Sequence, residues 1–246
     1  DRSILCTVEL PEEPVSVDID SAGERLIASG KGSLFCLNSR GDVLWRKTVS
    51  GIICDAALSQ NGRRIAVGTS DGRCLLLSPE GDQVGEFRAL PWVDGVALND
   101  DGSRCAVIAG MNGAMLFDAA DAKPVWSSQE NCAVHSVALA ASGAALTVCD
   151  AAVTLRDPQG VVIFRGRSEG RLMGGRISAN QRFIVTWSDA REVTRLDLKD
   201  CRHQAAETYE KAGEHAQAAA LYEEMGENAL AAKAFKAAGD LRRAAR

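Results

Sequence analysis

The chain has few aromatic residues and no paired metal-binding motif. Only 12 of its 246 residues are Phe, Trp or Tyr, and its 8 cysteines, at positions 6, 36, 54, 74, 105, 132, 149 and 201, never form a Cys-x-x-Cys pair. A structural zinc site needs four ligands within reach. The pairs Cys132/His135 and Cys201/His203 have no second pair nearby, so they predict structural roles. We expect buried free thiols in a reducing compartment, which indicates a cytoplasmic location.

Sequence motifs of common enzyme classes are also missing. There is no Walker sequence, dinucleotide fingerprint or His-Glu-x-x-His helix. The Gly-x-Ser-x-Gly match at residues 68–72 is followed by the apolar run RCLLL, whereas a nucleophile elbow requires a helix there. Asp18 and Asp20 begin a calcium-like loop whose twelfth position is Ser29, where a bidentate Glu is needed. We therefore assign no catalytic, cofactor-binding or metal-binding residue and expect a protein that is not an enzyme.

The charge balance argues against nucleic-acid binding. Lys and Arg number 28 and Asp and Glu 33, for a net charge of −5, and an acidic chain is poorly suited to neutralising phosphates. The densest basic run, RGRSEGR at residues 165–171, is interpreted as a solvated loop. Residues 131–149 lack Asp, Glu, Lys and Arg, but they are centred on a turn, so we expect a hairpin and no membrane insertion.

Five copies of a pattern about 40 residues long fill most of the chain. A turn glycine recurs as Gly23, Gly62, Gly102 and Gly143, and Gln181 replaces it in the fifth copy, giving spacings of 39, 40, 41 and 38. Short apolar runs separated by turn residues at this period are typical of β-propeller blades. We therefore predict a mainly β fold, a propeller of about five four-stranded blades over residues 1–200.

Each copy supplies recognisable strands. The first carries an aliphatic residue four positions before the turn landmark, and the second carries an apolar residue three positions after it. The fourth strand ends on a large ring in the first four copies, namely Trp45, Phe87, Trp126 and Phe164. Both faces of a blade are covered by neighbouring blades, so apolar residues on both faces are what packing requires.

The segment GSLFCLNSRGDVLWR at residues 32–46 resembles the repeat of PQQ-like propellers, with a strand between two glycines followed by Leu-Trp. The general plan is also similar to the WD-repeat superfamily, and these resemblances cover roughly residues 4–198. They imply the propeller fold. No copy carries the Gly-His or Trp-Asp pair of strict WD repeats, and no quinone site is recognisable, so the resemblance does not carry over a dehydrogenase activity.

Strand counting leaves the closure of the propeller open. The fifth copy has three strands, because residues 196–198 run into a helical segment. The apolar run at residues 4–10 belongs to no copy and could serve as the missing outer strand, closing a ring of five blades without an open edge. The alternative is that further blades lie upstream of Asp1.

The period changes to 13 residues over residues 201–246. Tyr209, Tyr222 and Phe235 share this spacing, and so do Gly213, Gly226 and Gly239. Each unit suits one short helix ending on a glycine cap. The stretch resembles tetratricopeptide-like α-solenoid repeats, in which short helices are stabilised by stacking. We expect the rings to be packing residues and the array, which lacks a capping repeat, to continue beyond Arg246 in a larger chain or complex.

These features predict a non-catalytic scaffold or adaptor that binds protein partners. A rigid propeller with variable loops and a helical array both suit protein binding. Two alternatives remain: a small-ligand or glycan-binding propeller, which should repeat aromatic residues at loop positions, and a hydrolase or lyase acting at the central channel.

Overall fold

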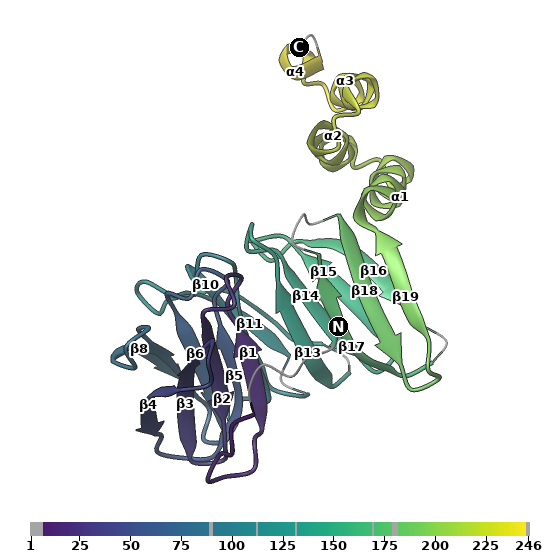
Figure 1. Ribbon diagram of the computed structural model, residues 1–246. Coiled ribbons are helices and arrows are strands. Elements are labelled where there is room, and N and C mark those ends of the chain that lie inside the picture. Colours follow the sequence, from purple (N-terminus) through teal and green to yellow (C-terminus); the bar gives the residue numbers. More distant parts are fainter. Residues whose placement is uncertain are drawn as a thin grey trace.

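The repeats form five antiparallel sheets, each a meander of consecutive strands (Figure 1). The computed structural model describes residues 7–88, 91–111, 113–130, 132–168, 170–178 and 182–244. Blade one contains β1 (Ser16–Ile19), β2 (Arg25–Ser29), β3 (Ser33–Asn38) and β4 (Val43–Thr48). Blade two contains β5 (Ile53–Leu58), β6 (Ile65–Thr69), β7 (Arg73–Leu77) and β8 (Gln83–Arg88).

The remaining blades follow the same order. Blade three contains β9 (Gly95–Leu98), β10 (Arg104–Ile108), β11 (Ala114–Asp118) and β12 (Pro124–Ser128). Blade four contains β13 (Val134–Leu139), β14 (Ala145–Cys149), β15 (Ala152–Arg156) and β16 (Val162–Arg167). Blade five has the three strands β17 (Leu172–Ile177), β18 (Phe183–Ser188) and β19 (Val193–Asp197). The predicted mainly β propeller is confirmed.

The turn glycines are required by backbone conformation. Gly62 has φ +66°, and its N–H donates to the Ser59 carbonyl at 2.8 Å. Gly102 has φ +73°, and a Cβ there would lie 2.6 Å from that of Arg64 in the preceding blade. A side chain at these positions would therefore be strained as well as crowded. Gln181, the fifth landmark, lies outside the described residues.

The first turn of blade four differs from the others by one residue. In blade two, Ser59 N donates to the Arg64 carbonyl, whereas in blade four Ala140 N donates to the Ala144 carbonyl. As a result Leu139 pairs with Ala145, and not with Leu146 as the common spacing from the glycine predicts. The predicted register holds in the other blades, for example Leu58 with Ile65.

Four hydrophobic cores in the described part of the propeller lie between neighbouring blades, and a smaller cluster lies within blade one. In one of the four, Ile27 and Leu34 of blade one pack with Ile53 and Leu58 of blade two. The central strands β6 and β14 are buried along their whole length. The outer-strand rings add to these contacts: Trp45 Nε1 donates to the Pro79 carbonyl of blade two at 2.9 Å. This explains why the repeat is apolar on both faces.

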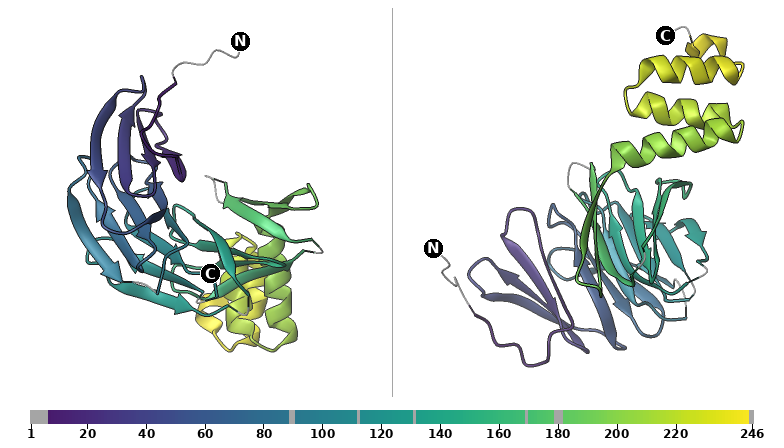
Figure 2. Two further views of the ribbon diagram at one scale, coloured as in Figure 1. Left: turned by 90° about the horizontal axis from the view of Figure 1, so that it is seen from below. Right: turned by 90° about the vertical axis from the view of Figure 1, so that its right-hand side faces the viewer.

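The five blades form an open arc (Figure 2, left). Val17 of blade one is 72% exposed and Val193 of blade five 73% exposed, because neither end blade has a neighbour on its outer side among the described residues. Leu10 packs against Phe35 and Leu37 of blade one.

Of the two alternatives for closure, the one in which residues 4–10 complete blade five does not hold for residues 7–10. They form no strand, and residues 4–6 lie outside the described part. The segment stays on blade one because Leu10 covers apolar surface there. The following Glu12 anchors it, accepting the Gly32 N–H at 3.0 Å and pairing with Arg46 at 3.2 Å.

The C-terminal segment is a row of four helices, α1 (Leu198–Lys211), α2 (His215–Glu224), α3 (Asn228–Ala237) and α4 (Leu241–Ala244) (Figures 1 and 2). Tyr222 and Phe235 are buried among alanines, and Tyr209 is half-buried beside them. Gly213, Gly226 and Gly239 have positive φ and end the helices. Leu198, at the start of α1, is buried in the core between blades four and five, which joins the helices to the propeller.

Candidate functional site

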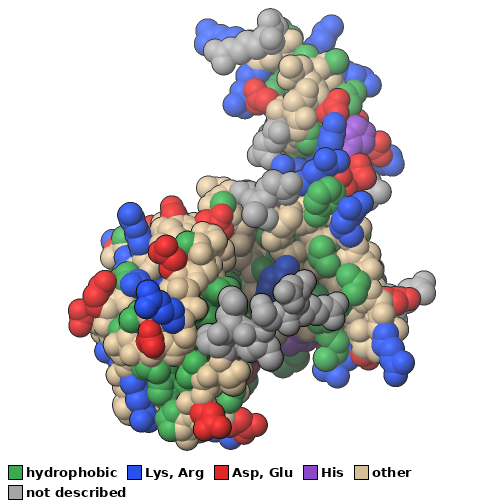
Figure 3. Space-filling model, in the orientation of Figure 1, with side chains coloured by type: hydrophobic (Ala, Val, Ile, Leu, Met, Phe, Trp, Pro, Cys, Tyr) green, Lys and Arg blue, Asp and Glu red, His purple; other side chains and the backbone are tan. Residues whose placement is uncertain are grey.

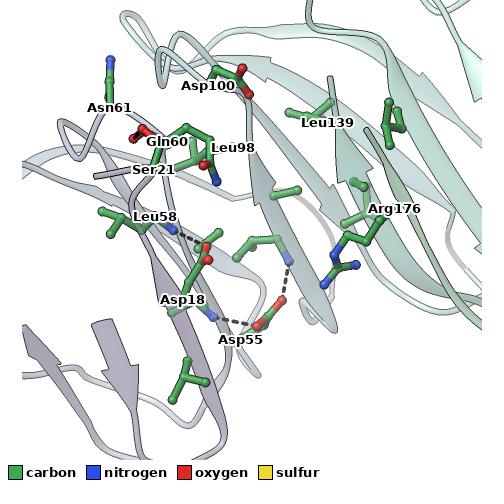
Figure 4. A pocket seen from close by; sticks show the side chains of 18 residues that line it. Asp18, Ser21, Asp55, Leu58, Gln60, Asn61, Leu98, Asp100, Leu139 and Arg176 are labelled. Atoms are coloured by element: carbon green, nitrogen blue, oxygen red, sulfur yellow. Dashed lines mark hydrogen bonds between the residues drawn. The ribbon is translucent and has the colours of Figure 1, made fainter. Parts of the chain in front are cut away.

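A cavity of about 650 Å³ lies on the concave side of the arc, along the inner strands (Figure 4). β1, β5, β9, β13 and β17 all contribute to its wall, so every blade reaches it. The lining mixes small apolar residues with a few charged side chains, chiefly Asp18, Asp55, Asp100 and Arg176. Clefts of this size, lined by apolar surface with a few polar groups, are common ligand or partner sites.

Acidic side chains on the inner strands join blade one to blade two and blade two to blade three. Asp18 Oδ2 accepts the Leu58 N–H at 2.8 Å, and Asp55 Oδ2 accepts the Val96 N–H at 3.0 Å, across 40 and 41 residues of sequence (Figure 4). These separations equal the repeat, so equivalent strands are joined in register. The carboxylates satisfy backbone donors that would otherwise face the cavity unpaired.

A second set of hydrogen bonds between neighbouring blades links the turns at one end of the cavity. Ser21 Oγ donates to the Gln60 carbonyl at 2.8 Å, and Asn61 Nδ2 donates to the Asp101 carbonyl at 3.0 Å. Asn99 Nδ2 reaches the Ala141 carbonyl at 3.4 Å. The polar residues of the repeat turns therefore have structural partners in the neighbouring blade.

Burial raises the pKa of Asp55. The N–H groups of Val96 and Ala56 and the positive charge of Arg176 oppose this effect, because they favour the carboxylate. Asp55 accepts hydrogen bonds through both carboxylate oxygens. Its geometry indicates a joining role between blades two and three.

Arg176 carries the one positively charged side chain among the described residues that line the cavity. It precedes Ile177 on β17 as Asp18 precedes Ile19, and the next two blades have Ala57 and Ala97 at this position. Its guanidinium points across the cavity toward Asp55 (Figure 4). Nη1 donates to the Gly175 carbonyl at 3.0 Å, the group lies 6.0 Å from the Trp187 ring, and no described carboxylate lies within ion-pair distance. Arg176 is thus available to an acidic ligand group.

The motifs weighed from sequence fall in separate structural contexts. Thr69 Oγ1 donates to Asp71 Oδ1 at 2.6 Å in the β6–β7 turn, so the Gly-x-Ser-x-Gly match lies between two strands, as expected. Asp20 Oδ1 accepts the Glu24 N–H at 2.9 Å within the first turn of blade one. His135 lies 3.7 Å from Asp150. Within the described ranges, no three His, Cys, Asp or Glu residues gather as metal ligands.

The basic run at residues 165–171 is divided among different partners. Arg165 lies 3.6 Å from Glu130, and Arg171 lies 2.9 Å from Asp150. Lys and Arg side chains are interspersed with Asp and Glu over the visible face (Figure 3). This run is therefore not a single basic patch.

Sequence reasoning missed Arg176 and the buried ion pair of Arg156 with Glu130. These two side chains are 7% and 5% exposed and lie in blade four and in the loop before it. Both arginines carried a signal, because each stands where the other repeats have an apolar, small or acidic residue. A departure from the repeat pattern does not show in which direction the guanidinium of either arginine points.

Comparisons with known proteins agree with this architecture. A sequence profile of the family described as outer membrane protein assembly factor BamB matches residues 4–182. The search of curated proteins found no match. Among solved structures, the β-propeller domain of Cps50 (Swd1) from Myceliophteria thermophila is similar, with a TM-score of 0.68 and 15% identity over 77% of this chain and 66% of that one. At this identity the likeness establishes the fold alone.

The family match covers far more than half of the chain and falls on the propeller repeats. It agrees with the resemblance of residues 32–46 to PQQ-like repeats. The chain spans slightly less than two thirds of the similar propeller domain. No helix in the described parts is long and apolar enough to cross a membrane. The chain belongs to the family of PQQ-like repeat proteins described as outer membrane protein assembly factor BamB.

Proposed function

We propose that this protein is a non-catalytic scaffold that binds a protein partner on the concave side of its propeller. One observation carries the proposal: the cavity reached by all five blades holds an arginine, Arg176, without a carboxylate partner among the described residues. The inner carboxylates Asp18 and Asp55 are occupied as ties between blades. The cavity therefore offers shape and a positive charge to an acidic partner segment.

The helical row is a second interaction surface in this proposal. Its short helices each pack on the next, as in tetratricopeptide-like solenoids, and such arrays bind partners along an extended surface. The family is described as an assembly factor, which supports a role within a larger complex. The described free cysteines support a cytoplasmic site of action, because thiols persist in reducing compartments.

A binding experiment with charge reversal tests the proposal. Wild-type protein, Arg176→Glu and the matched surface variant Arg63→Glu are immobilised, and proteins retained from a cytosolic extract are quantified by mass spectrometry. We expect a defined acidic partner that the wild type and Arg63→Glu retain and that Arg176→Glu loses, because like charges repel in a cavity of reduced dielectric. An identical set of proteins on all three would contradict partner binding at the cavity.

A further inference from the structure

A second cavity lies where the helices meet the propeller. It has a volume of about 390 Å³. The β15–β16 turn at Asp157–Val161 borders it on one side, and α1 and α2 border it on the other. In Figure 1 these helices lie beyond the end of blades four and five. Small-molecule sites commonly fall in this size range and at such junctions.

This second cavity, the junction groove, has largely apolar walls. Pro158 and Ile163 contribute from blade four, and Tyr209 and Leu221 contribute from the helices. Val161, which also borders the groove, is 56% exposed. An apolar ligand would therefore remove hydrocarbon surface from water on both sides at once.

Arg202 of α1 lines the same groove. Its Nε is buried, and no described residue accepts a hydrogen bond from it. Asp157 also borders the groove, but its Oδ1 accepts the N–H groups of Gln159 at 2.9 Å and Val161 at 2.8 Å. No ion pair joins Asp157 to Arg202 in the described structure. A buried donor of a charged group is costly when it is left unpaired.

We propose that the junction groove binds a small monocarboxylate with an apolar body, such as a medium-chain fatty acid. The carboxylate accepts hydrogen bonds from the Arg202 guanidinium, which presents donors in the fork geometry that carboxylates match. The hydrocarbon chain lies against Pro158, Ile163 and Leu221. This site goes beyond the scaffold role and does not depend on Arg176.

Decanoate is the probe that tests the proposal. Saturation-transfer NMR and calorimetry on the whole chain should detect decanoate binding, and the uncharged decanol should bind much more weakly. Replacing Arg202 with Gln should weaken decanoate binding about tenfold to a hundredfold, the range expected for a charge-assisted hydrogen bond. Arg63→Gln, on the far blade two, should bind as the wild type does.

A second variant guards against misfolding of Arg202→Gln. Val161→Glu adds a negative charge at an exposed position of the groove, so it should repel decanoate while leaving the melting curve unchanged. Equal affinities for decanoate and decanol would overturn the proposal. So would an affinity of Val161→Glu for decanoate equal to that of the wild type. A peptide with an apolar C-terminal residue that binds through Arg202 when decanoate does not would also overturn it.

Discussion

Neighbouring blades and neighbouring helices are held together by different kinds of contact. Between blades, aliphatic cores are supplemented by side-chain hydrogen bonds that cross about one repeat of sequence, such as Asp18 to Leu58. Between helices, contact depends on alanines and the two buried rings Tyr222 and Phe235. The blades distribute their stability over many groups, whereas the helical row concentrates it in a few. Substitutions should therefore affect the two regions differently.

The largest effect is expected in the helical row. Tyr222 is 2% exposed, and Tyr222→Ala should cost about 3 kcal/mol through the cavity that it leaves. Helical circular dichroism and protease resistance after residue 200 should fall together, while the β signal remains. Leu241→Ala, at an exposed position, is the control and should change neither. Loss of the β signal at the same temperature would show that the two regions unfold as one unit.

A smaller effect is expected when a tie between blades is removed. Asp55→Ala removes the carboxylate that accepts the Val96 N–H and leaves the Ala56 N–H with Ser16 Oγ as its remaining acceptor, which should cost about 2 kcal/mol. Urea unfolding followed through the β circular dichroism signal measures this loss of stability. The helical signal from α1 to α4 should be unaffected. Asp121→Ala, at an exposed Asp in the β11–β12 turn, should be neutral by comparison. An unchanged free energy of unfolding for Asp55→Ala would mean that this hydrogen-bonded link between blades does not contribute to stability.

The repeat architecture was predictable from sequence because it depends on local rules. Glycine at a positive φ, as at Gly62, and alternation of apolar residues specify hairpins wherever they occur. Closure depends on which apolar surface a segment covers. Strand counting allowed residues 4–10 to complete blade five, but Leu10 lies on Phe35 and Leu37 of blade one, which is closer in sequence.

The charged groups of the two cavities were less predictable. Arg176 and Arg202 look alike in the sequence as isolated arginines. Only the arrangement of the blades and helices shows that Arg176 faces Asp55 and that Arg202 has a buried Nε for which no described residue is an acceptor. Residues whose role depends on contacts between distant repeats leave no local pattern.

The dependence of stability on pH should differ in sign between two aspartates. Burial raises the pKa of Asp55, so its contribution to stability is greatest below its ordinary value of about 4 and is lost as pH rises through the raised pKa. The Ala120 N–H and Arg104 lower the pKa of Asp118, so its contribution is lost as pH falls through the lowered pKa. Urea titrations of Asp55→Asn and Asp118→Asn against the wild type should show opposite slopes.

The smallest effect is expected at the N-terminal segment. Leu10→Ala removes part of the cover over Phe35 and should cost about 1 kcal/mol, less than a fully buried leucine would. Hydrogen exchange should quicken in β3 of blade one and stay unchanged in β19. Faster exchange in β19 instead would indicate that the N-terminal segment lies on blade five.

Photo-crosslinking from the concave cavity tests the scaffold account most directly. A photoreactive amino acid placed at Leu98, which lines the cavity, should capture the partner, whereas the same group at Val84 on outer strand β8 should not. Capture at Leu98 should also disappear with Arg176→Glu. Equal capture at both positions, or capture at Val84 alone, would contradict binding on the concave side.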